Sequence, residues 1–110
     1  MLVVPCSVKT LAGIAHGYAG TLIERAADVT IKEGRKLLIS PREMPFSAIH
    51  LENMLKLARL GVIVAPQVPA FYHGANDLEG LVDFVAGKIL DAFGVPHKLF
   101  KPWCGRIEEI

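Results

Sequence analysis

A short apolar stretch that runs into a polar loop, followed by a helical pattern, occurs three times in this chain of 110 residues. The apolar stretches are residues 2–4, 37–39 and 62–65, and each is followed at once by a loop that opens on proline or reaches one at its second position. Strands that alternate with helices predict an α/β domain with a parallel sheet and flanking helices. Ligands of such sheets bind outside the carboxyl ends of the strands, so the three loops mark one candidate site.

Composition excludes several classes of protein. The formal net charge of +1 provides no basic surface for nucleic acid. No apolar run approaches the roughly 18–20 residues that a membrane span needs, and the start has no charged region typical of a signal peptide. Two cysteines are too few for a disulfide scaffold, which favours a reducing, cytoplasmic setting. The hydrophobic content of 52% is high for a small domain, and predicts either a homo-oligomer or a fold of which this chain is a part.

The first loop, residues 5–10, combines the hydroxyls of Ser7 and Thr10 with the ammonium group of Lys9. We expect a helix from Leu11, with Thr10 as its N-cap. A helix N-terminus attracts anions and polarised groups, so this loop is a candidate binding site. An ordinary capped helix with a solvated Lys9 explains the same residues equally well.

The second loop places Arg42 and Glu43 between Pro41 and Pro45. An arginine beside a glutamate at a ligand-binding edge can bind an oxyanion and transfer a proton. The alternative is a surface salt bridge, which is usually worth less than about 1 kcal/mol. The position of the pair after a strand favours the functional interpretation.

The other candidate residues carry weaker signals. The hydroxyl of Tyr72 could bind phosphate or lie at the surface above a packed ring, and Trp103 is a candidate lid or interface anchor. The scattered cations, such as Arg25, Lys32 and Lys88, are individually no more than solvated charges. The four histidines show no metal-ligand spacing, so no metal site is predicted.

Taken together, these motifs resemble the flavin prenyltransferases of the UbiX type, which are also called phenylacrylic acid decarboxylases. The resemblance runs through nearly all of the chain, and several specific motifs occur in the same order as in the family. They are Pro5-Cys6-Ser7-Val8-Lys9-Thr10 with the helix after it, residues 22–29, Pro41-Arg42-Glu43-Met44-Pro45, residues 50–54, residues 69–72, and Trp103.

The resemblance implies a Rossmann-like flavoprotein fold with three α/β/α layers. It also implies an activity: reduced FMN is alkylated at N5 by dimethylallyl monophosphate, and a further ring closes at C6. The prenylated FMN then serves a separate UbiD-type decarboxylase, and no metal is required. Family members build their sites between the subunits of a large homo-oligomer, possibly a dodecamer.

Roles for single residues also follow from the resemblance. Glu43 is the expected proton-transfer group, and Trp103 helps to close the site. The expected flavin contacts are Ser7, Val8, Lys9, Thr10 and Arg42, and the residues around the prenyl phosphate are Arg25, Lys32, Tyr72 and Lys88. The chain departs from the family pattern at position 8, where methionine is commoner, and at position 88, where arginine is usual. Lysine keeps the charge there but loses the planar fork that binds phosphate with two donors.

A further departure concerns the extent of the chain. Family members carry an additional N-terminal segment with a glycine- and serine-rich phosphate loop, and nothing in this sequence matches it. We therefore expect residues 1–110 to be a single flavoprotein domain that is incomplete at its N-terminus. Two alternatives stay open. One is a related flavin-dependent cysteine decarboxylase, although its loop carries Asn where this chain has Lys9. The other is a non-catalytic fragment that keeps only an oligomerisation surface.

Overall fold

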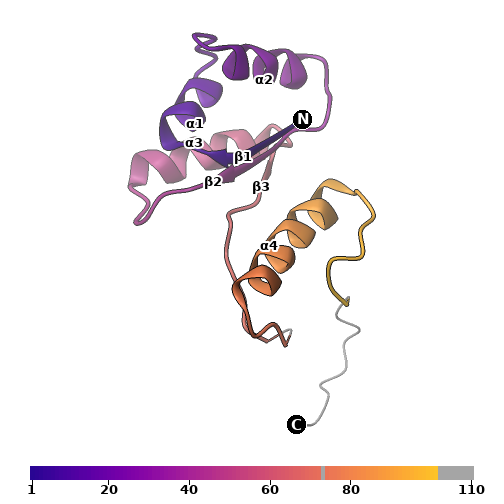
Figure 1. The fold of residues 1–110 in the computed structure, drawn as a ribbon. Helices are drawn as coiled ribbons and strands as arrows, with labels where there is room; N and C mark the ends of the chain where they lie inside the picture. The colour runs from indigo at the N-terminus through magenta and orange to yellow at the C-terminus, as the bar shows by residue number, and fades with distance from the viewer. Residues whose placement is uncertain (73, 102–110) are drawn as a thin grey trace. The chain divides into compact units, whose positions relative to one another are not determined.

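The computed structural model of the chain describes residues 1–72 and 74–101, which divide after Gln67 into two compact units. The described part of the second unit contains one helix, α4 (Leu78–Phe93). Strands and helices alternate in the first unit, as the sequence predicts (Figure 1). Its elements are β1 (Leu2–Cys6), α1 (Val8–Ala15), α2 (Leu22–Lys32), β2 (Leu38–Pro41), α3 (Ala48–Arg59) and β3 (Ile63–Val64).

The three strands form one parallel sheet in the order β1-β2-β3, which confirms the predicted α/β class. Leu38 N donates to Met1 O at 2.9 Å at the start of the β1–β2 pair, and Ala65 N donates to Ile39 O at 2.9 Å beyond β3. Because all three strands run in the same direction, the loops that follow them leave from one edge of the sheet.

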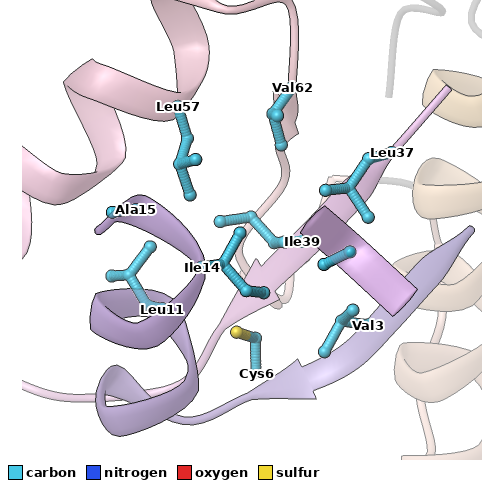
Figure 2. Close-up of a cluster of buried hydrophobic side chains, with 10 residues drawn as sticks. Val3, Cys6, Leu11, Ile14, Ala15, Leu37, Ile39, Leu57 and Val62 are labelled. Atoms are coloured by element: carbon cyan, nitrogen blue, oxygen red, sulfur yellow. The ribbon is translucent and has the colours of Figure 1, made fainter. Parts of the chain in front are cut away.

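The core of the first unit lies between the sheet and its helices. Figure 2 shows side chains from β1 and β2 facing those of α1 and α3. Several of the buried residues fall in the three apolar stretches that the sequence analysis assigns to strands. Such continuous apolar stretches are expected for parallel strands that are buried on both faces. The buried cluster consists of Val3, Cys6, Leu11, Ile14, Ala15, Ala27, Leu37, Ile39, Leu57 and Val62.

The first polar loop is shorter than its sequence suggests. β1 continues to Cys6, and residues 8–10 form the first turn of α1 rather than a loop before it. The N-cap is Ser7, whose hydroxyl accepts a hydrogen bond from Thr10 N. The assignment of Thr10 as N-cap is therefore wrong. A cap residue accepts from the backbone two or three positions ahead, and Ser7 is placed to do so.

The second unit is built around α4. Asp77 caps its N-terminus by accepting from Gly80 N, and Gly94 ends it in the left-handed conformation with φ of 89°. Gly87 lies against the rings of His97 and Phe100, so the segment after α4 packs back on the helix that precedes it. None of the described helices has the length and apolar character needed to cross a membrane.

Candidate functional site at the strand ends

The structure joins the first two polar loops at the carboxyl edge of the sheet. Arg42 N donates to Cys6 O at 3.0 Å, and Cys6 is aligned with Pro41 in the β1–β2 pairing. Ser7 follows Cys6 directly, so the cap of α1 lies next to the backbone that carries Arg42. Residues about 35 positions apart in the sequence are brought together here by strand pairing alone.

The N-terminus of α1 is suited to an anionic or electron-rich group. Ser7 Oγ accepts from Thr10 N and also donates to Thr10 Oγ1, both at 3.1 Å. The first two N–H groups of the helix, on Val8 and Lys9, have no carbonyl partner within a helix. The first turn contains no acidic residue, so the positive end of the helix dipole is not neutralised locally. Lys9 is exposed and adds a full positive charge.

Arg42 and Glu43 are both exposed at this edge. Glu43 Oε1 accepts a hydrogen bond from Met44 N at 3.0 Å, which ties one carboxylate oxygen to the loop backbone. The two side chains form no ion pair with each other. The alternative of a surface salt bridge between them is thus not supported, and the guanidinium group remains able to meet a ligand.

The third loop contributes a contact that the sequence analysis did not identify. Gln67 Nε2 donates to Ser40 Oγ at 2.8 Å and to Ser40 O at 3.1 Å. Ser40 is fully buried near the end of β2, two residues before Arg42. The sequence does show one polar residue, Gln67, between Pro66 and Val68 in the loop after the third apolar stretch. That local pattern does not reveal that Ser40 is the hydrogen-bond partner of Gln67.

Two predicted phosphate ligands, Arg25 and Lys32, lie elsewhere in the first unit. Both are exposed on α2, seven residues and therefore about two helical turns apart. Near the C-terminal end of this helix, Thr30 Oγ1 lies 3.5 Å from Met1 Sδ. Met1 precedes β1, whereas Ser7 follows it, so Lys32 lies toward the opposite end of β1 from the strand-end residues.

The remaining predicted site residues belong to the second unit or lie beyond the described residues. Tyr72 is 76% exposed, and its ring meets that of Phe84 edge-on at 5.7 Å between centroids. Lys88 is exposed on α4. Trp103 lies outside the described residues. Within residues 1–72 and 74–101, no group of three or more His, Cys, Asp or Glu side chains could hold a metal ion.

Comparison with known proteins is consistent with a flavin-related site. The family model described as Flavoprotein matches residues 1–90. The flavin prenyltransferase UbiX of Methanocaldococcus jannaschii is 54% identical over 103 residues, which are 94% of this chain and 56% of the relative. A probable UbiX-like flavin prenyltransferase of Escherichia coli O157:H7 is 54% identical over 105 residues, covering 96% of this chain and 53% of the relative.

Solved structures show the same likeness. A dodecameric FMN-dependent UbiX-like decarboxylase from Escherichia coli O157:H7 matches with a TM-score of 0.91 and 54% identity, over 96% of this chain and 57% of the solved chain. AnUbiX (PadA1), solved in complex with FMN and dimethylallyl pyrophosphate, matches with a TM-score of 0.92 and 48% identity, over 97% and 57% of the two chains.

The chain thus spans a little over half the length of the relatives and solved chains that it matches. Over that part, the parallel sheet with flanking helices agrees with the fold that the resemblance implies. The chain belongs to the flavoprotein family, and its sequence and fold are similar to those of the UbiX flavin prenyltransferases.

Proposed function

We propose that the chain acts in prenyl transfer to reduced FMN, with dimethylallyl monophosphate as the donor. The observation that carries the proposal is the meeting of the α1 N-terminus with the Arg42–Glu43 segment at one edge of the sheet. The relative solved with FMN and dimethylallyl pyrophosphate supports this choice of ligands, because 97% of this chain matches it at 48% identity.

The residues at the strand ends fit a flavin nucleotide. The unneutralised N-terminus of α1, the Ser7 and Thr10 hydroxyls and the Lys9 ammonium group offer donors and positive charge to electron-rich flavin atoms or phosphate. Val8 would contribute backbone N–H at the same turn. Arg42, held by its backbone to Cys6 O, would bind an oxygen of the same ligand.

Glu43 would move protons in this reaction. The donor carbon that carries the phosphate would bond to flavin N5 as its C–O bond to phosphate breaks and the N5 proton leaves. Ring closure would then require the prenyl alkene to gain a proton and C6 to lose one as the new carbon–carbon bond forms. A carboxylate at the binding edge can accept and return that proton. The hydrogen bond from Met44 N holds Glu43 Oε1 to the loop backbone, and the Glu43 side chain is exposed.

The prenyl phosphate would be bound by Arg25, Lys32, Tyr72 and Lys88, with Trp103 closing the site. Positive charges of this kind stabilise a leaving phosphate. Lys32 lies toward the other end of β1 from Ser7, so we propose that Arg25 and Lys32 serve the site of a neighbouring copy in a homo-oligomer. The dodecameric state of the similar Escherichia coli protein supports such an assembly.

We also propose that the protein acts in the cytoplasm and that a UbiD-type decarboxylase uses its product.

The test is a mass measurement on bound flavin. The purified chain is loaded with FMN, reduced with dithionite, and incubated with dimethylallyl monophosphate. We expect the flavin to gain one prenyl group. A folded, FMN-loaded sample whose flavin keeps its mass would contradict the prenyltransferase assignment. Release of CO₂ from a peptide with a C-terminal cysteine, by the FMN-loaded chain before reduction and with the flavin taking up two electrons, would favour the cysteine decarboxylase. Failure to bind FMN would favour a non-catalytic fragment.

The Glu43→Gln variant tests the assigned proton transfer. It keeps the size of the side chain and one oxygen able to accept from Met44 N, so folding and FMN affinity should change little. Turnover should fall about 10²–10⁴-fold, the range expected for loss of a general acid–base group. A variant that turns over at the wild-type rate would remove Glu43 from the mechanism.

A further inference from the structure

The Ser40–Gln67 contact joins the ends of two strands at the candidate site. Ser40 is 0% exposed, and both of its acceptors, the hydroxyl and the carbonyl oxygen, receive hydrogen bonds from one Gln67 amide group. A carbonyl oxygen can only accept, so the nitrogen of the Gln67 amide must face Ser40. The orientation of this side chain is therefore fixed by the contact itself.

Packing alone does not call for a serine at this place. The three residues before Ser40 are buried and apolar, and β2 is the central strand of the sheet. Burying a hydroxyl there costs free energy unless it is hydrogen-bonded. Gln67 supplies that bond across 27 positions of sequence, and its own side chain is only partly buried. The pair therefore ties the loop after β3 to β2 at the ligand-binding edge.

The Arg42–Glu43 segment is anchored on both sides as a result. On one side Arg42 N donates to Cys6 O of β1, and on the other Ser40 is held by Gln67 beyond β3. We infer that Gln67, acting through Ser40, is a positioning residue that holds Arg42 and Glu43 at the sheet edge. The kinetic part of the test below rests on the proposed function, whereas the hydrogen-exchange part does not.

The structural arm of the test measures hydrogen exchange at single amides. Gln67→Met keeps the length of the side chain and removes both donors. We expect exchange at the Arg42 amide to speed up by about tenfold, the equivalent of one lost hydrogen bond. Exchange at the Leu38 amide, which is bonded to Met1 O at the other end of β2, should stay close to that of the wild type.

A double-mutant cycle identifies the partner. Ser40→Ala removes one of the two acceptors and should speed exchange at Arg42 by less than Gln67→Met does. The Ser40→Ala/Gln67→Met double variant should match Gln67→Met, because the hydroxyl has already lost its partner. Additive effects of the two changes would overturn the inference, since they would show that the side chains act separately.

Asn53→Leu is the matched control. Asn53 is a buried amide of the same unit, and its Oδ1 lies 3.0 Å from His16 Nε2, between α3 and the end of α1. This variant loses a side-chain amide contact away from the strand ends. It should lower the free energy of unfolding without a preferential effect on the Arg42 amide. If Gln67→Met behaves as Asn53→Leu does, with equal changes at Arg42 and Leu38, Gln67 contributes only general stability and the inference is wrong.

The catalytic arm separates kcat from KM. In a sample whose wild type turns over, Gln67→Met should lower kcat for prenyl transfer about 10- to 100-fold through misplacement of Glu43, with the KM for dimethylallyl monophosphate unchanged. An unchanged kcat beside altered exchange at Arg42 would overturn the positioning role in catalysis. A wild type without turnover would contradict the proposed function, while the exchange measurements would still decide whether Gln67 holds the segment.

Discussion

At the scale of single residues, Cys6 illustrates how position decides chemistry. Figure 2 shows its thiol among the buried side chains, although its backbone carbonyl holds Arg42 at the binding edge. Burial disfavours the thiolate and raises the pKa of Cys6 from 9.0 to about 11. The thiol is neutral at physiological pH, so it is a core residue and not a nucleophile.

The pH dependence of Cys6 gives a first prediction. In a Cys104→Ser background, alkylation of the folded protein by iodoacetamide should stay slow at pH 8–9 and accelerate only toward pH 11. The folded pKa is above the unfolded one, so the contribution of this thiol to stability is complete below pH 9 and is lost as pH rises toward 11. Mass spectrometry of labelled protein measures the rate, and rapid labelling of the folded protein at pH 8 would contradict the buried assignment.

Lys88 gives a second prediction at this scale. If its ammonium group binds the prenyl phosphate, Lys88→Ala should raise the KM for dimethylallyl monophosphate about 10- to 100-fold, the equivalent of one charged hydrogen bond, and leave FMN affinity unchanged. Lys88→Arg should keep activity because the charge is retained and a second donor is added. Titration of both ligands distinguishes the outcomes, and equal weakening of both would indicate a loss of stability instead.

The sequence predicts one of the contacts at the strand ends but not the other. It placed the Ser7–Thr10 segment and the Arg42–Glu43 segment at one edge, because parallel strands deliver their loops to the same side. The Ser40–Gln67 pair is not predictable from the sequence, because it depends on the register of β2 with β3 and on a side-chain contact across 27 positions. No local pattern contains that information.

At the scale of elements, local sequence identifies the start of α2, whereas the limits of the strands depend on their partners in the sheet. The spacing of Thr21 and Glu24 is that of a capping box, and both of its hydrogen bonds are present. The second apolar stretch predicts a strand over residues 37–39, but β2 spans Leu38–Pro41. Strand limits are set by pairing partners in the sheet, which an apolar stretch does not specify.

The contact between α1 and the start of α2 depends on a glycine. A Cβ at Gly13 would lie 2.6 Å from Glu24 Cδ. Glu24 cannot move away freely, because it is 5% exposed and its Oε2 accepts from Gly20 N at 2.9 Å and Thr21 N at 3.3 Å. Gly13 thus allows the buried carboxylate to close the turn between the two helices.

Gly13→Ala should therefore destabilise the first unit. The loss of the buried carboxylate bonds, about 1–3 kcal/mol, should exceed the gain of about 1 kcal/mol that alanine brings to a helix interior. Urea unfolding measures the net change. Glu24→Ala is the informative background: with the carboxylate gone, Gly13→Ala should become neutral or stabilising. A Gly13→Ala single variant more stable than the wild type would show that Glu24 relaxes at little cost.

At the scale of the whole molecule, β1 is an outer strand of the described sheet. β1 pairs with β2 on one side only, and its Leu2 and Val4 side chains are 41% and 45% exposed. Together with a hydrophobic content of 52%, this unpaired side of β1 is a surface that favours pairing with another chain. The proposed homo-oligomer leads to the same expectation of association.

We therefore expect the 110-residue chain to self-associate in solution through this edge, and Val4→Lys to shift it toward smaller species, because a charge on an edge strand disfavours further pairing. Leu22→Lys is the matched control, since it adds the same charge at an 83% exposed position on α2, away from the sheet. Light scattering after size-exclusion chromatography measures the mass of each species. If both variants dissociate equally, net charge and not the β1 edge governs assembly, and a wild type that elutes as a monomer would refute the expectation outright.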